Sequence, residues 1–195
     1  MNYTIDKSYY NLIEIKKSKF FTYLFPVSDV AKLEEELSNL RKKYNDATHI
    51  CYAYVLSSPN LEKCSDDGEP DGTAGKPMLD IIKKNNLTDV LLVVIRYFGG
   101  IKLGAGGLIR AYAGSGNEII KLCKMGYKKE ITKYEIECKI NDSKKLLEKL
   151  RKENIEIVTQ EYGENFKVQV LSDNLMLDGY KFVELEKTKV FYDKD

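Results

Sequence analysis

The chain of 195 residues contains few of the side chains that build structural zinc sites. It has one histidine, His49, and four cysteines, at positions 51, 64, 123 and 138, with no Cys-x-x-Cys pair among them. Structural zinc sites use closely spaced pairs of such ligands. The sequence therefore argues against a zinc site, and we expect reduced thiols, no bound metal and no cofactor.

Long apolar runs are also absent. The longest, VLLVVI at residues 90–95, is six residues long, whereas a membrane-spanning helix needs about 20. The polar start MNYTIDKSYY lacks the apolar segment of a secretory signal peptide. These absences predict a cytoplasmic protein that does not associate with membranes.

Two common nucleotide-binding motifs are missing as well. A P-loop ending at Gly75 and Lys76 would place Pro70 at its first glycine and Pro77 at its magnesium-binding hydroxyl. A dinucleotide-binding fingerprint beginning at Gly104 would have Ile109 where its third glycine is required. No Ser-His-Asp arrangement with recognisable local context accompanies the histidine. We therefore assign no catalytic residue and favour a non-enzymatic function.

The apolar patterns that are present predict an α+β protein. Strands are expected at residues 10–15, 19–25, 50–56 and 90–95, and helices at 30–44, 78–85 and 104–124. A long, turn-rich loop is expected to follow the third strand. Because the run at 90–95 shows no alternation, it predicts a strand that is covered on both faces or lies in the centre of a sheet. Gly126 is expected to stop the last of these helices.

The remaining residues repeat a simpler scheme. A strand at 131–140, a helix capped by Asn141 or Asp142, and a hairpin about Gly163 are followed by a helical segment at 175–185 and a strand at 188–192. The resulting βαββαβ order is the split pattern of ferredoxin-like domains. We therefore expect two domains, residues 1–130 and residues 131–195.

Two glycine-rich runs are the most distinctive part of the chain. They read SDDGEPDGTAGKPML at residues 65–79 and RYFGGIKLGAGGLIRAY at residues 96–112, and residues 65–113 hold eight of the thirteen glycines. Such density indicates places where backbone geometry or close access is needed. The acidic residues of the first run lack the spacing of a calcium loop, and Asp-Gly and Glu-Pro pairs are typical of turns. We interpret that run as a turn scaffold, with Asp66 or Asp67 pairing with Arg96 or Arg110.

Positive charge is concentrated in residues 76–129, where ten Lys or Arg side chains face three acidic ones. Within this stretch, a strand ending at Arg96, a glycine-rich turn and a helix starting near Ala105 would present free backbone N–H groups at a helix N-terminus. Such a terminus suits phosphate or another anion. The alternative is that these glycines only permit tight packing of the helix against the sheet.

We predict one concavity that binds an anion or a nucleic acid, formed where the acidic loop meets the glycine-rich turn. Its binding residues would be Lys76, Arg96, Lys102, Gly104, Ala105, Gly106, Gly107 and Arg110. The loop lining it would contribute Ser65, Asp66, Asp67, Gly68, Glu69, Gly72, Thr73 and Gly75. We interpret His49 as a hydrogen-bonded structural histidine, with a direct role in the site as the alternative.

The two glycine-rich runs, together with KSKF at residues 17–20 and DATH at residues 46–49, resemble the IMPACT family, including the YigZ-like proteins of bacteria. Asp71 departs from the family pattern, which usually has a small residue there. The resemblance implies that the first domain folds like domain IV of elongation factor G, with its ribosomal-protein-like β/α fold. It also implies that the second domain is ferredoxin-like, as is domain V of that factor.

Three functions remain open after this comparison. The first is a non-enzymatic protein that binds RNA, the ribosome or a protein partner in the translation machinery and regulates translation. The second is an enzyme or binder of a small phosphorylated or nucleotide ligand at the glycine-rich turn, and the third is a protein-interaction module. Eukaryotic relatives regulate translation through an additional N-terminal domain, so their function is not transferred to this chain.

Overall fold

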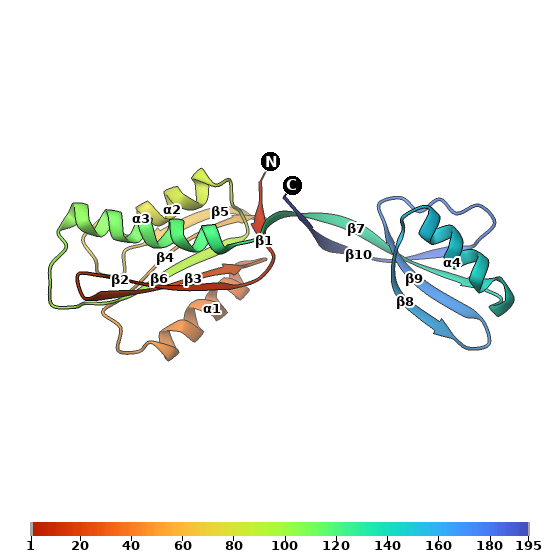
Figure 1. Ribbon diagram of the computed structural model, residues 1–195, viewed down its shortest axis with the longest axis horizontal. Coiled ribbons are helices and arrows are strands. Elements are labelled where there is room, and N and C mark those ends of the chain that lie inside the picture. The colour runs from red at the N-terminus through yellow and green to blue at the C-terminus, as the bar shows by residue number, and fades with distance from the viewer. Residues whose placement is uncertain (1, 195) are drawn as a thin grey trace. The chain divides into compact units, whose positions relative to one another are not determined.

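The computed structural model describes residues 2–194. They divide into two compact units, a first unit that runs to Tyr127 and includes the last residues from Asp193, and a second unit of residues Lys128–Tyr192. Two sheets and four α-helices make up the described chain (Figure 1). The expected mixture of helices and strands is thus confirmed. No helix within residues 2–194 combines the length and the apolar character that a membrane crossing requires.

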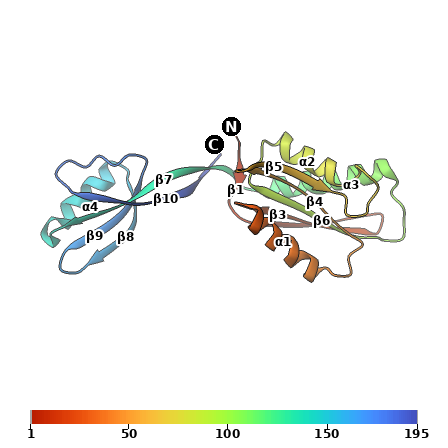
Figure 2. The ribbon, with the colours of Figure 1, turned by 180° about the vertical axis from the view of Figure 1, so that it is seen from behind.

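The first unit is built on a five-stranded antiparallel sheet. Its strands follow the order β2 (Tyr9–Ile15), β3 (Ser18–Pro26), β6 (Val90–Tyr97), β4 (His49–Ser57) and β5 (Asn60–Ser65). The apolar run VLLVVI therefore forms the central strand, as its lack of alternation predicted. Helix α1 (Val30–Lys43) covers one face of the sheet, and α2 (Gly75–Lys84) and α3 (Ala105–Leu122) cover the other (Figures 1 and 2).

Side chains of β6 alternate between two hydrophobic cores. Val90, Leu92 and Val94 belong to the core under α2 and α3, whereas Leu91, Val93 and Ile95 belong to the core under α1. All six are fully buried. The two cores therefore hold the strand from both sides and fix the place where it ends, at Arg96 and Tyr97.

The loop that follows β6 rests on the turn between β2 and β3. Lys16 and Lys17 form that turn with positive φ angles of 47° and 63°. A Cβ atom on Gly99 would lie only 2.0 Å from the carbonyl carbon of Lys17, so no larger residue fits there without a backbone shift. The backbone N–H of Gly99 also donates to the Ser18 hydroxyl at 3.2 Å. Two chain reversals are thereby fixed at one end of the sheet.

The second unit has one helix against a sheet. It contains most of β7 (Met125–Cys138), a 3-10 turn at Ile140–Asp142, α4 (Ser143–Lys152), β8 (Glu156–Tyr162), β9 (Phe166–Ser172) and most of β10 (Phe182–Asp193). Strand β7 lies between β9 and β10, β8 pairs with the far side of β9, and the short strand β1 (Thr4–Ile5) pairs with the first residues of β7. The core of the unit gathers Ile136, Leu146, Leu150, Phe166, Val168 and Val170.

The helix expected at residues 175–185 is not present in this part of the described chain, so the βαββαβ prediction was wrong at its fifth element. Leu175 and Leu177 instead bury their side chains two residues apart, a spacing that extended backbone provides and a helix does not. Gly179 then turns the chain with a φ of 88°, and β10 begins at Phe182. The observed order of this unit is βαβββ.

Two other boundaries also differ from the sequence predictions. Strand β5 lies within the stretch that was expected to be a long loop. The sequence did not predict it, because its residues lie at the sheet edge, are mostly exposed and carry no alternating apolar pattern. Gly126 does not stop a helix, since α3 already ends at Leu122 and Gly126 pairs with Thr4 in the sheet.

We expect the Gly99→Ala substitution to destabilise the protein by about 1–3 kcal/mol, because the added methyl group overlaps the Lys17 backbone. Gly114→Ala is the matched control, since Gly114 lies inside α3 with open space around its Cβ position. It should stabilise the helix by about 0.5–1 kcal/mol. Urea unfolding followed by circular dichroism measures both, and equal stability of the two variants would contradict the close approach at Gly99.

Candidate functional site

A cleft of about 450 Å³ lies in the first unit where the start of β4, the end of β6, the loop after β5 and the start of α3 meet. Its walls are formed by Thr48, His49, Glu69, Pro70, Arg96, Phe98, Lys102, Leu103, Gly104, Ala105 and Leu108. A volume of this size is typical of sites for small ligands, which combine apolar walls with a few polar groups. The cleft therefore has both the size and the composition of a binding site.

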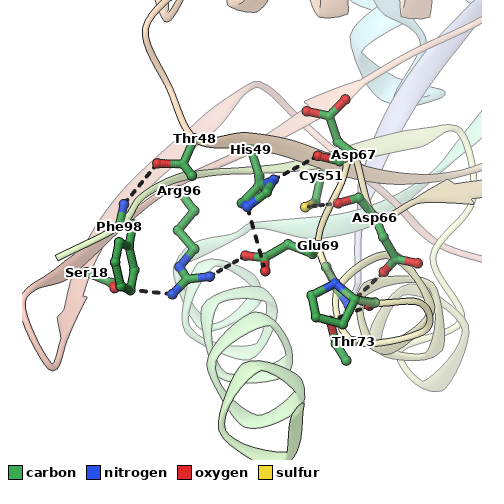
Figure 3. A network of polar contacts seen from close by, with 12 residues as sticks. Ser18, Thr48, His49, Cys51, Asp66, Asp67, Glu69, Thr73, Arg96 and Phe98 are labelled. Carbon is green, nitrogen blue, oxygen red and sulfur yellow. Dashed lines mark hydrogen bonds and ion pairs between the residues drawn. The ribbon is translucent and has the colours of Figure 1, made fainter. Parts of the chain in front are cut away.

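A buried ion pair forms part of its wall. Arg96 Nη1 donates to Glu69 Oε1 at 2.6 Å, and the Tyr112 hydroxyl donates to the same oxygen at 2.8 Å. The side chains of Arg96 and Glu69 are only 6% and 3% exposed. Because both charged groups are buried and no longer hydrated, each is stabilised mainly by the opposite charge of the other. The pair thus ties the loop after β5 to the end of β6 (Figure 3).

His49 joins this network from the first residue of β4. Its Nδ1 lies 2.9 Å from the carbonyl oxygen of Asp67, and because a carbonyl only accepts, Nδ1 carries the hydrogen. Its Nε2 lies 3.8 Å from Glu69 Oε2, too far for a hydrogen bond. The ring is thus held by one hydrogen bond, as a structural histidine would be, while its other nitrogen faces the buried carboxylate (Figure 3).

The acidic loop is held together by carboxylates that accept backbone hydrogen bonds. Asp66 accepts from the N–H groups of Gly72, Ala74 and Gly75 at 2.8–2.9 Å. Burial alone would raise the pKa of Asp66, but these three donors lower it below its usual value. Asp67 accepts from the Ile50 N–H at 2.7 Å. These hydrogen bonds give the loop the role of a turn scaffold. The predicted pairing of these aspartates with Arg96 or Arg110 was wrong, because Arg96 forms its ion pair with Glu69.

The Cys51 thiol, which adjoins this network, lies in surroundings that make it unreactive. Cys51 is fully buried and its Sγ donates to the Asp66 carbonyl oxygen at 2.9 Å. Burial raises the pKa of Cys51, and burial likewise raises the pKa of Tyr112, whose hydroxyl lies 3.4 Å from the same sulfur. Since the thiolate is the nucleophilic form, Cys51 is a packing residue. All four cysteines are free.

The N-terminus of α3 forms another part of the cleft wall. Gly104 caps the helix with a φ of +71°, a conformation that favours glycine, and within residues 2–194 no side chain accepts a hydrogen bond from the first turn. The first N–H groups of a helix have no acceptor within it and carry partial positive charge. Lys102 lies beside them in the cleft, and the buried Nε–H of Arg96 has no acceptor among the described residues. Together these donors suit an anion.

The structure brings five of the sequence-predicted site residues to the cleft. These are Glu69, Arg96, Lys102, Gly104 and Ala105. The others lie outside its walls: Ser65, Asp66, Asp67, Gly68, Gly72, Thr73, Gly75, Lys76, Gly106, Gly107 and Arg110. Lys76 pairs with Asp80 on the exposed side of α2 at 2.5 Å. Arg110 is exposed one turn into α3, where its Nη1 lies 3.6 Å from the position of a Cβ on Gly106.

Sequence reasoning missed Thr48 and Phe98 as wall residues. The Thr48 hydroxyl accepts from the Phe98 N–H at 3.0 Å, so the two positions are coupled across the strands. Both stand inside the segments DATH and RYFGG that carried the family resemblance. Their place in these segments could have marked both residues as candidates, but it does not indicate which side chains face the cleft.

Sequence comparison places this site in a known family. The Impact N-terminal domain matches residues 16–120. The IMPACT family member YvyE of Bacillus subtilis is 48% identical over 117 residues, which cover 60% of this chain and 54% of YvyE. An IMPACT family member of Haemophilus influenzae is 37% identical over 155 residues, covering 78% of this chain and 75% of its own. The match to YigZ of Escherichia coli, 40% identical over 128 residues, covers 64% of this chain and 63% of YigZ.

A solved structure shares the fold. The crystal structure of a hypothetical protein superposes with a TM-score of 0.63 and 32% identity, over 87% of this chain and 84% of its own. The two-domain translational regulator Yih1 superposes with a TM-score of only 0.36 and 20% identity, over 62% of this chain and 46% of its own. That superposition is too weak to indicate a common arrangement.

The Arg96→Met substitution should destabilise the protein by about 3–5 kcal/mol, because it leaves the Glu69 carboxylate buried without its countercharge. The double variant Arg96→Met/Glu69→Gln should recover much of this loss, since it removes both charges and keeps an acceptor for Tyr112. Urea unfolding measures both. Lys76→Met, which breaks an exposed ion pair, is the control and should change stability little. A single Arg96 variant as stable as this control would contradict the interpretation.

Proposed function

The chain belongs to the IMPACT family, and from its cleft we propose that it is a non-enzymatic RNA-binding protein that holds an RNA phosphate at the N-terminus of α3. The observation that carries this proposal is that uncapped helix N–H groups and Lys102 lie in one cleft beside the buried Arg96, whose Nε–H has no acceptor among the described residues. Phosphate contacts supply most of the affinity of such proteins for nucleic acids.

The distribution of free cations supports the same location. Of the ten Lys and Arg side chains in residues 76–129, six form ion pairs: Lys76, Lys83, Arg96, Lys121, Lys124 and Lys129. Among the described residues the other four, Lys84, Lys102, Arg110 and Lys128, form no ion pair. Two of them, Lys102 and Arg110, flank the first turn of α3. Lys16 and Lys17 lie in the turn on which the loop after β6 rests. Basic side chains outside ion pairs are therefore available to a phosphate chain at this end of the sheet.

We further propose that the RNA belongs to the translation machinery and that the protein acts there, in the cytoplasm, as a regulator. The support is the resemblance of the family to factor domains that work on the ribosome. The aligned regions span only 54% of YvyE and 63% of YigZ. The partners of the whole protein are therefore part of this proposal and are not taken over from those relatives. Co-sedimentation with ribosomes at low and high salt would test it.

A second candidate function is the binding of a small phosphorylated ligand. The cleft volume of about 450 Å³ and its largely apolar walls favour a small ligand of this kind. A thermal-shift panel of nucleotides and sugar phosphates separates the two, because a ligand present at 100 times its Kd should stabilise the fold by about 2.7 kcal/mol. A flat panel would leave RNA as the ligand.

The Lys102→Ala variant should bind single-stranded RNA more weakly and show a salt dependence whose slope is smaller by about 0.7, the value for one lost phosphate contact on a single strand. Lys121→Ala is the control, because Lys121 lies roughly 24 Å farther along α3 and pairs with Glu118. Fluorescence anisotropy titrations at several salt concentrations measure both variants. No binding by the wild-type protein at roughly 100 μM in low salt would sink the proposal.

A further inference from the structure

Phe98 is an exposed aromatic side chain in the wall of the cleft. It is 45% exposed and shares the cleft with Lys102 and Ala105. In the described part of the first unit, Tyr10 is the other aromatic residue that is nearly half exposed, and it lies outside the cleft. Leaving an aromatic ring in water forgoes the free energy of its burial. Its place beside an anion site therefore points to a ligand that has a flat apolar part as well as a phosphate.

The position of this ring is fixed by its surroundings. The Phe98 N–H donates to the Thr48 hydroxyl, and the guanidinium carbon of Arg96 lies 5.5 Å from the ring centroid. The next residue, Gly99, is seated against the Lys17 backbone. Figure 3 shows the ring beside the Arg96 side chain. A ring held in this way loses little conformational freedom when a second flat group stacks on it.

We propose that the cleft takes an unpaired nucleotide, whose base stacks on Phe98 and whose phosphate lies at the N-terminus of α3. This inference rests on the proposed RNA-binding function and narrows its ligand to single-stranded RNA. Stacking on aromatic side chains is how proteins hold unpaired bases with little sequence preference. In a duplex each base is already stacked on its neighbours and paired, so it reaches such a ring only after it is extruded.

The guanidinium of Arg96 links the two parts of the proposed subsite. The Nη1 of Arg96 donates to Glu69, and its guanidinium carbon lies 5.5 Å from the centroid of the Phe98 ring. The Nε–H of Arg96 has no acceptor among the described residues. Glu69 cancels most of the charge of Arg96, so the phosphate depends mainly on the helix N-terminus and Lys102. The base subsite should therefore be less sensitive to salt than the phosphate subsite.

The test uses a labelled single-stranded RNA of about 12 nucleotides without self-complementarity, within the usual range of site sizes, and the same strand annealed to its complement. Fluorescence anisotropy gives the affinity of each for the wild-type protein and for the variants Phe98→Ala, Phe98→Leu and Phe98→Tyr. The control is Tyr10→Ala, which removes an equally exposed ring from β2, outside the cleft. Circular dichroism confirms that each variant is folded.

We expect the wild-type protein to prefer the single strand to the duplex. Phe98→Ala and Phe98→Leu should weaken single-strand binding by about 5- to 150-fold, the usual effect of removing one stacking side chain, and should leave duplex binding unchanged. Phe98→Tyr, which keeps the ring, and Tyr10→Ala should bind as the wild-type protein does. Phe98→Leu keeps apolar bulk against Arg96, so it separates stacking from packing if the alanine variant does not fold.

Equal affinity of the wild-type protein for strand and duplex would overturn this inference, and so would single-strand binding that the leucine variant retains in full. In both cases RNA binding through phosphates alone would stand. Failure of the wild-type protein to bind either RNA would instead overturn the proposed function itself. The two failures are therefore distinguishable in one set of titrations.

Discussion

The ion pair between Glu69 and Arg96 is the interaction on which the candidate site depends. It is almost completely removed from water, and it joins a loop to the end of the central strand across 27 positions of sequence. A buried charge that loses its partner is costly, so the loop cannot leave without exposing or stranding Arg96. The same carboxylate also accepts a hydrogen bond from Tyr112 of α3 and faces His49 of β4, so Glu69 contacts three of the elements around the cleft.

The two-sided core around β6 makes this tie effective. Alternate side chains of the strand are packed under α1 and under α2 and α3, so Arg96 emerges from a strand that has no freedom to shift. The loop is anchored independently, because Asp66 accepts three backbone N–H groups at the start of α2. The pair therefore joins two rigid parts, and the cleft between them is largely preformed. Preformed sites lose less free energy to ordering when a ligand binds.

The electrostatics of the cleft are those of a selective site rather than a general basic surface. Of the Lys and Arg side chains in its walls, Arg96 is neutralised by Glu69, whereas Lys102 forms no ion pair among the described residues. Lys102 and the N–H groups at the N-terminus of α3 lie in these walls next to the Phe98 ring. Such a site offers few contacts of fixed geometry, and under the proposed function these would favour one form of nucleic acid over another.

The elements that depend on local pattern could be predicted from the sequence: the unalternating apolar run as central strand, the amphipathic helices, and the glycine-rich turn before α3. It could not reveal β5, whose exposed edge carries no pattern, or the extended segment that replaces the last expected helix. The pairing of Arg96 with Glu69, rather than with Asp66 or Asp67, and the place of His49 and Phe98 in the same cleft are visible only in the packed fold. Local pattern sets backbone conformation, whereas the choice among neighbouring carboxylates depends on the direction each side chain takes once distant segments are packed together.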